Sequence, residues 1–386
     1  MEEATIRLEE AQKSLRAAEE ELLKAKQRYR MAKEELEAAE KAVEACEELL
    51  TEKTEAAPVL KIPVLNLSKQ YMNNSKAARM LTTLGIEIGE DAVAIDVSIK
   101  AGTVTRVDVW MDDELPATSV KLQPFDAAIM DAVYTLLCSG CEIFTIDTLA
   151  KVVSGNPMIR LTPKNGEVLR SSVEKLRRIN IQINCADELA KRKDLTDQQK
   201  ASTFESLLLP VVPVSAEYQV NGKTTQAYKI TEIPALYRYA SLLHQIADIH
   251  ADTLHTSKLF ADTMEAILIK RYVAKRVAQI VNPKNKIRSN KVSFCWSDHG
   301  RMKGLFPELG YEMTGDSRWR SVKKRVRRIV ELTLQSLQDR EVITGFKEYR
   351  EDGTNNPASP VSGYMVFYDS PPRLRKGGSY CMSHAT

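Results

Sequence analysis

The stretch from residue 316 to 368 constrains the fold most, because it joins a basic amphipathic helix to two short strands. Between positions 318 and 328 it carries seven cations and no acid: Arg318, Arg320, Lys323, Lys324, Arg325, Arg327 and Arg328. Apolar residues recur at helical spacing from Trp319 to Leu337, which predicts a helix with one packed face and one cationic face. Asp316 or Ser317 can cap its first turn.

Two segments with alternating apolar residues follow this helix, at 343–350 and 364–368, and a polar loop at 351–363 separates them. They predict a pair of strands. A basic helix followed by such a hairpin is typical of a winged helix-turn-helix, in which the helix reads DNA and the loop of the hairpin is the wing.

Most charge runs belong to solvated helices that mix both signs of charge. This run stays cationic until Glu331, and like charges this close repel one another unless an anion such as a DNA backbone screens them. We therefore favour an interface with double-stranded DNA over a solvated face or a face that docks onto an acidic protein. The DNA interface is expected to include three cations of neighbouring segments: Arg301, Lys303 and Lys347.

The charge of the chain is distributed unevenly. Residues 1–57 carry 10 bases and 16 acids, and residues 58–257 carry 21 bases and 23 acids. Residues 258–350 carry 21 bases and 10 acids, a net charge of +11, although the whole chain has only +3. Positive potential is thus concentrated towards the C-terminus, where a polyanion would bind.

With 386 residues, of which 43% are hydrophobic and 28% charged, the chain can form two or three domains with cores of their own. No apolar run is long enough to cross a bilayer, and the chain opens with Met1, Glu2 and Glu3. We therefore expect neither a membrane anchor nor a signal peptide, and a bacterial cytoplasmic location near the nucleoid or a plasmid. The six scattered cysteines fit free thiols.

A heptad pattern runs from Leu8 to Leu50 without Gly or Pro. A large residue recurs every seventh position: Leu8, Leu15, Leu22, Tyr29, Leu36, Val43 and Leu50. A small residue follows three positions after each of the first six: Ala11, Ala18, Ala25, Ala32, Ala39 and Cys46. The pattern predicts a coiled coil about 65 Å long, for which we expect self-association, with a lone or intramolecular helix as the alternative. The direction of the pairing stays open.

The chain between this helix and the basic helix divides at residues 58, 122 and 257. Residues 58–121 are expected to form a flanking element with a short helix at 75–84 and a hairpin at 91–100 and 103–111. Residues 122–256 are expected to begin with helix 122–137, strand 143–146, helix 147–153 and helix 162–178. Strand 179–184 completes winged-helix order, with the polar insertion 187–206 in the place of its wing. A hairpin at 211–230 and a helix from Pro234 to Ile246 follow.

Residues 257–368 are expected to repeat that order. The predicted elements are helix 258–281, strand 291–295, a short helix starting at Ser297 or Asp298, and the basic helix. Residues 369–386 are rich in Pro, Gly, Ser and Arg and are predicted to be a disordered tail. The predicted fold class is α+β, mainly α, with two tandem winged-helix domains after a long coiled-coil helix.

Over about residues 120–368, the chain resembles the replication initiators of iteron-containing plasmids and related mobile elements. The resemblance lies in Leu122-Gln-Pro-Phe-Asp-Ala-Ala-Ile-Met-Asp-Ala-Val-Tyr134, Ser172-Val-Glu-Lys-Leu-Arg-Arg178 and Lys270-Arg-Tyr-Val-Ala-Lys-Arg276. It implies that 318–328 reads the major groove and that the third helix of the first domain makes a weaker contact. The cations of that helix are Lys164, Arg170, Lys175 and Arg177. The acidic coiled coil departs from the pattern of the family.

No constellation of residues supports catalysis, a cofactor or a metal. Cys138 and Cys141 form the one CxxC pair, with no further ligands near them in the sequence. His244, His250 and His255 do not have the spacing of a zinc-binding helix, and no phosphate-binding loop is present. We therefore expect a non-enzymatic initiator that binds repeated origin DNA and meets host replication proteins. The alternatives are a transcriptional regulator dimerised by the coiled coil and a coiled-coil scaffold that docks onto an acidic protein.

Overall fold

The computed structural model describes residues 59–100, 103–111, 119–200, 203–256, 258–282, 289–298, 301–350 and 359–369, together with a few helical positions between 21 and 41. The chain divides into two units, Met1–Val59 and Leu60–Thr386. In the predicted coiled-coil seam only Ala32 is described, and it is helical and exposed. The other seam positions and the tail 370–386 lie outside the described residues, so both remain predictions. Among the described helices, none combines the length and the apolar character that a membrane span needs.

The first group of elements in the second unit starts with α3 (Pro124–Cys138), β7 (Ile143–Phe144), α4 (Ile146–Ser154) and α5 (Pro163–Leu176). The hairpin of β10 (Val211–Tyr218) and β11 (Thr224–Ile230) completes it. β7 pairs with β11, and β1 (Lys61–Ile62) extends the sheet at β10, so the strand order is β1-β10-β11-β7. We call α3, β7, α4, α5, β10 and β11 the proximal module.

The helix starts of the proximal module follow from their caps. Thr162 accepts a hydrogen bond from the amide of Asn165, and Pro163 occupies the first position of α5, where no amide hydrogen is needed. The predicted helix 147–153 starts one residue too late: α4 begins at Ile146, Thr145 caps it by accepting from the amide of Thr148, and Asp147 lies in the first turn. A threonine two residues earlier can cap because the preceding strand ends at Phe144.

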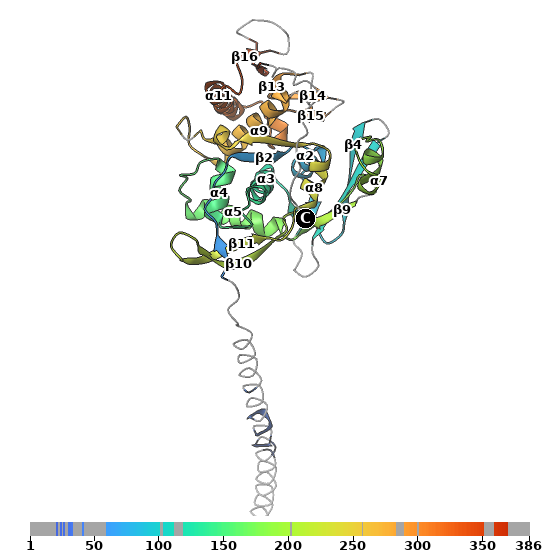
Figure 1. Ribbon diagram of the computed structural model, residues 1–386, viewed down its shortest axis with the longest axis vertical. Helices are drawn as coiled ribbons and strands as arrows, with labels where there is room; N and C mark the ends of the chain where they lie inside the picture. Colours follow the sequence, from blue (N-terminus) through green and yellow to red (C-terminus); the bar gives the residue numbers. More distant parts are fainter. Residues whose placement is uncertain are drawn as a thin grey trace, which may run out of the picture. The chain divides into compact units, whose positions relative to one another are not determined.

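A second group has the same order. It consists of α9 (Met264–Val281), β13 (Lys291–Ser293), α10 (Leu305–Glu308), α11 (Ser317–Asp339) and the hairpin of β16 (Gly345–Tyr349) and β17 (Gly363–Phe367). β13 pairs with β17, which gives the order β13-β17-β16. In both groups the strand after the first helix pairs with the last strand of the hairpin. We call this group the distal module (Figure 1).

An insertion separates α5 from β10. It contains β8 (Ile179–Asn184), α6 (Ala186–Ala190), α7 (Asp197–Lys200) and β9 (Thr203–Leu207). β8 pairs with β9 and with β5 (Thr103–Met111), which pairs with β4 (Val93–Lys100), so the insertion and the predicted hairpin form one sheet, β4-β5-β8-β9. The strand 179–184 is confirmed, but its place in a winged helix with 187–206 as the wing is wrong. An alternating pattern predicts a strand but not the strand with which it pairs. The hairpin of the proximal module consists of β10 and β11.

Further elements join these parts. α2 (Lys76–Thr83) and α8 (Ala235–Leu242) lie near the predicted positions, and the described part of the second unit also contains three short antiparallel pairs. These pairs are β2 (Lys69–Asn73) with β12 (Ile246–His250), β3 (Glu87–Ile88) with β6 (Val120–Lys121), and β14 (Trp296–Asp298) with β15 (Arg301–Lys303). Residues 296–298 are thus a strand and not the start of a helix, and Ile246 begins β12 and is not helical. The described chain is mixed α/β and not mainly helical as predicted.

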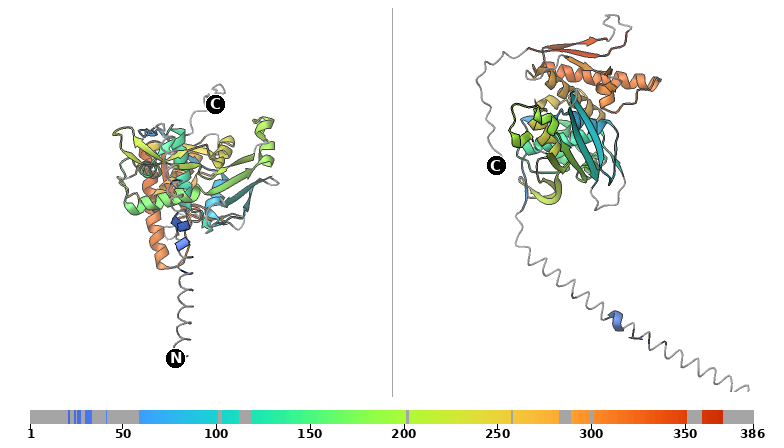
Figure 2. Two further views of the ribbon diagram at one scale, coloured as in Figure 1. Left: turned by 90° about the horizontal axis from the view of Figure 1, so that it is seen from below. Right: turned by 90° about the vertical axis from the view of Figure 1, so that its right-hand side faces the viewer.

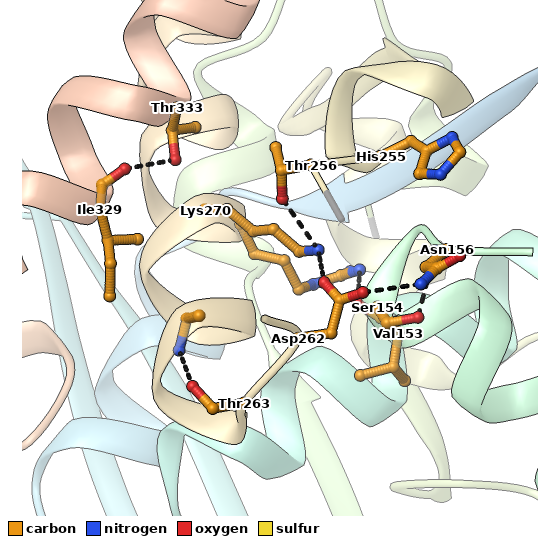
Figure 3. A network of polar contacts seen from close by, with 12 residues as sticks. Val153, Ser154, Asn156, His255, Thr256, Asp262, Thr263, Lys270, Ile329 and Thr333 are labelled. Carbon is orange, nitrogen blue, oxygen red and sulfur yellow. Dashed lines mark hydrogen bonds and ion pairs between the residues drawn. The ribbon is translucent and has the colours of Figure 1, made fainter. Parts of the chain in front are cut away.

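Helix α9 belongs to the distal module and also packs against the proximal one. Its Lys270, whose side chain is fully buried, lies 2.6 Å from Asp262, and the same carboxylate accepts a hydrogen bond from Asn156 of the proximal side (Figure 3). Arg271 lies 3.5 Å from the buried Asp131 of α3. The two modules are therefore joined through buried charges that are paired across the joint, which is the condition for burying them at tolerable free energy.

Candidate nucleic-acid interface

Helix α11 is anchored at both ends of its buried face. At its start, Asp316 accepts a hydrogen bond from the amide of Trp319, and the Trp319 ring packs against Phe306 with centroids 4.7 Å apart. Further along, Val326, Val330 and Leu334 are buried against the core of the distal module. The first turn contains no acid, so the positive end of the helix dipole adds to the cations beside it.

The opposite face of α11 carries a row of cations. Arg320, Lys324 and Arg328 are spaced four residues apart, so they stack along one side of the helix. All three are exposed, and none of them forms an ion pair with the described part of the chain. We call these three residues the cation row. Figure 2 shows α11 in orange as the longest described helix, next to the β16 and β17 hairpin in its right-hand view.

Two of the seven predicted cations are held by carboxylates of other elements. Arg325 donates two hydrogen bonds to Glu265 of α9, at 2.6 and 2.8 Å, and this guanidinium holds the pKa of the Glu265 carboxyl below its usual range. Arg327 pairs with Glu348 of β16 and lies 3.4 Å from the Tyr364 hydroxyl. Both remain partly exposed but orient α11 on its module. Glu265 and Glu348 were missed from the sequence, since nothing local shows that they meet a helix 60 and 21 residues away along the chain.

Arg318 and Lys323 flank the cation row. Both are exposed, and the Lys323 ammonium lies 5.7 Å from the centre of the Trp319 ring. The contact stabilises the lysine without neutralising its charge. On the hairpin, Lys347 is exposed with its ammonium 5.6 Å from the Phe367 ring, and β16 lies beside α11. These residues extend the positive surface on either side of the row.

Arg301 and Lys303 lie on β15, in a hairpin that precedes α10. The Lys303 ammonium lies 5.3 Å from the Trp296 ring of the paired strand, and it is half-buried beside α9 and β13. The structure thus places Lys303 in a cavity and separates it from the cation row.

The third helix of the proximal module differs from α11. Three of its four predicted cations pair with carboxylates: Arg170 with Glu167 at 3.0 Å, Lys175 with Asp126 at 2.5 Å and Arg177 with Glu174 at 2.6 Å. Lys175 is largely buried, and Asp126 also caps α3, so this pair holds two helices together. Of the four, only Lys164 is exposed without an ion pair among the described residues.

The cysteines and histidines form no site in the part of the chain that is described. Cys138 and Cys141 are free thiols, and burial raises the pKa of both. No group of three or more metal-ligating side chains occurs among the residues that the structure describes.

No known protein family and no curated protein matches the sequence. Two crystal structures of domains 2 and 3 of RctB, one of them from selenomethionine derivatives, resemble the fold with 12% sequence identity. The TM-scores are 0.34 and 0.35, and the matches cover 75% of this chain and 96% and 95% of the RctB chains. At this level of similarity, the function of RctB does not transfer to this chain.

Proposed function

We propose that this protein binds double-stranded DNA in a sequence-specific manner, with α11 as its reading helix. The cation row of Arg320, Lys324 and Arg328 carries the proposal, because it lies opposite the buried face and its charges are not neutralised by the described chain. Lysine and arginine at such a position neutralise phosphates and reach guanine edges in the major groove.

We infer further that both modules are winged helices. In each, the third helix is followed by a hairpin whose last strand pairs with the strand after the first helix. In helix-turn-helix docking, the N-terminal part of that third helix enters the major groove. In α11 this part holds Arg318, Arg320 and Lys324, whereas Arg328 lies deeper and is better placed for phosphate.

The two modules contribute unequally. The cations of α5 are mostly engaged by Glu167, Asp126 and Glu174, and a paired cation releases fewer counterions when DNA binds. We therefore assign the main contact to α11 and a weaker one, centred on Lys164, to α5.

We propose replication initiation at repeated origin sites as the biological role, which rests on the resemblance of residues 120–368 to initiators of iteron-containing plasmids. A transcriptional regulator is the alternative. Direct repeats beside the gene, each bound by the protein, would favour the initiator. Binding to a single palindrome and to no repeat would favour the regulator.

Substitution of the cation row tests the DNA-binding proposal. We expect Arg320→Ala to weaken binding to the cognate duplex by about 1–3 kcal/mol and to change binding to random duplex little, as for one bidentate guanine contact. We expect Arg328→Ala to weaken binding to both duplexes alike and to lower the salt slope by about 1. Fluorescence anisotropy over a series of salt concentrations measures both quantities. The duplexes are taken from the DNA that adjoins the gene.

Arg340→Ala is the matched control, since Arg340 is an exposed arginine at the far end of the same helix. It should bind both duplexes as the unchanged protein does. The assignment of α11 is refuted when substitutions of Arg318, Arg320 and Lys324 each leave the ratio of cognate to random binding unchanged.

A further inference from the structure

A cavity of about 190 Å³ lies between the proximal and distal modules. One side is formed by α2 and α3, and the other by α9, α10 and strands β13, β14 and β15. Neither the cation row nor the hairpin of β16 and β17 contributes to its wall. It is therefore distinct from the surface proposed to read DNA.

The wall of the cavity has an excess of positive charge. Asp131 and Glu308 are its two acids. Its six bases come from four elements and are Arg79, Arg271, Lys275, Arg276, Lys291 and Lys303. The balance is a formal excess of four positive charges in a space enclosed by two modules, where the attraction for an anion is stronger than at an open surface.

The two acids of the wall are paired with two of its bases, Arg271 with Asp131 at 3.5 Å and Arg79 with Glu308 at 3.8 Å. Arg276 donates to the backbone carbonyls of Lys291 and Ser289, at 3.0 and 3.3 Å, and to the Gln279 side chain. The ammonium group of Lys291 lies over the ring of Tyr349, 4.4 Å from its centre. Such contacts orient the side chains and leave their charges in place.

Two residues of the cavity wall carry a buried polar atom without a hydrogen-bond partner in the described chain. Arg271 is 4% exposed and is partly satisfied: its Nη1 atom donates to the Gln70 side chain and to the Val153 carbonyl, at 3.1 and 3.3 Å. Its Nη2 atom forms an ion pair with Asp131 at 3.5 Å but no hydrogen bond. The Oδ1 atom of Asn74 is likewise buried and lacks a donor. Both residues line the cavity. Buried polar groups are nearly always satisfied in folded proteins, so an unsatisfied donor of this kind indicates a missing partner.

Lys275 is the third unusual residue of the wall. It forms no ion pair or hydrogen bond with any residue that the structure describes, and desolvation lowers its pKa. Asp131 and Glu308 offset this loss of water only in part, since neither forms a direct ion pair with Lys275, so an anion beside the ammonium group would stabilise the fold.

We propose that this cavity binds a compact phosphate-bearing anion, of the size of inorganic phosphate or pyrophosphate. The Nη2 group of Arg271 and the ammonium of Lys275 suit phosphate oxygens, because charge-assisted hydrogen bonds to such oxygens are the strong ones. The volume is below the roughly 300–1,000 Å³ of pockets that hold drug-sized ligands. An anion at this position contacts both modules and stabilises their docking.

The test uses the full-length protein and its melting temperature in pyrophosphate, in phosphate and in chloride at matched ionic strength. A ligand that binds only the folded state raises the melting temperature until the site saturates. We expect this rise with pyrophosphate or phosphate and not with chloride. In Lys275→Met we expect an unchanged or higher melting temperature without anion, and binding weakened by about tenfold or more, as expected for one lost charge-assisted contact.

Lys193→Met is the matched control, since Lys193 is an exposed lysine in the insertion, outside the wall of the cavity. It should respond to the anions as the unchanged protein does. If Lys275→Met does not fold, Arg79→Gln at the exposed rim provides the same comparison.

Binding to duplex DNA distinguishes a site for a free phosphate anion from a site for a phosphate of the DNA backbone. For a site that takes a free anion, Lys275→Met leaves the affinity for duplex unchanged. The proposal is overturned if neither anion raises the melting temperature of the unchanged protein more than chloride does. It is also overturned if Lys275→Met weakens duplex binding and leaves the response to pyrophosphate intact, because the cavity would then hold a phosphate of the DNA.

Discussion

The cations of this protein differ in role according to the carboxylates that the fold brings to them. Arg320 and Arg325 are five residues apart on α11, yet the first is exposed without an ion pair in the described chain and the second is clamped by Glu265. Lys175 of α5, which the sequence grouped with DNA-binding residues, is largely buried against Asp126. Residue type and spacing predicted a basic surface, but only the packing shows which charges remain available to a partner.

The pair of Arg325 and Glu265 makes stability depend on pH. The pKa of Glu265 in the folded state lies below its unfolded value of about 4.3, because its ionised form accepts two hydrogen bonds from Arg325. The contribution is therefore fully present above the unfolded pKa and is lost as the pH falls through the folded pKa.

We expect Glu265→Gln to lower the free energy of unfolding at pH 7 by up to about 1 kcal/mol, since the pair is partly exposed. The difference from the unchanged protein should disappear in acid, once Glu265 is protonated in both states. Urea unfolding at several pH values measures this, with the exposed Glu331→Gln as the comparison. A deficit of Glu265→Gln that persists undiminished in acid would contradict the electrostatic origin.

At the level of elements, helices with strong caps were predictable and strand partners were not. The helix predicted from residue 162 has Thr162 as its cap and Pro163 as its first residue, and Asp316, one of the two predicted caps of the basic helix, caps α11. The same kind of signal failed at 296–298, where Ser297 and Asp298 suit a helix cap but Trp296 and Asp298 pair with β15. Capping is a local property, whereas a strand depends on a partner that the local sequence does not specify.

The cations of α11 were predictable from charge and periodicity, but the charged cavity was not. In the sequence, residues 270–276 stand out only as part of the resemblance to plasmid replication initiators. In the structure Arg271, Lys275 and Arg276 line a space closed by α2, α3 and the β14 and β15 hairpin. Cations within an otherwise apolar helix were the sequence signal for a charged cavity. The sequence alone does not show which elements cover that helix.

Gly155 shows how one element depends on its neighbour. It ends α4 in the left-handed region at φ 67°, and a Cβ at this position would overlap the Cβ of Leu254 and lie 2.9 Å from its carbonyl carbon. Gly85 follows α2 at φ 60° with nothing within 4 Å of an added Cβ. A non-glycine residue would be strained at both positions, but only at Gly155 would its Cβ also clash with a neighbour.

We therefore expect Gly85→Ala to destabilise the fold by about 1–2 kcal/mol through strain alone. Gly155→Ala should cost a further 1–3 kcal/mol, roughly, because η1 (Ala251–Leu254) has to move. Chemical denaturation of the two variants gives both values. Equal losses would show that α4 and η1 are not packed as described.

At the level of the whole molecule, the heptads at 8–50 predict association. An a/d seam six heptads long exposes too much apolar surface for a helix without a partner. We expect light scattering to give a higher oligomeric state for the full chain than for a chain that starts at Pro58. The double substitution Leu15→Lys and Leu22→Lys in the full chain should also lower the oligomeric state. A monomeric mass for the unchanged full chain would rule out self-association.

The pairing of early strands with late ones has a consequence for synthesis on the ribosome. β1 pairs with β10 and β2 with β12, so both strands emerge long before His250, the end of β12, is made. Until then β2 has open edges, which are sites for unwanted pairing with other chains. In the distal module, β13 and β16 both pair with β17, which belongs to the same stretch of chain. During translation the early strands of the proximal side therefore wait longest for their partners, whereas the distal module can close within its own sequence.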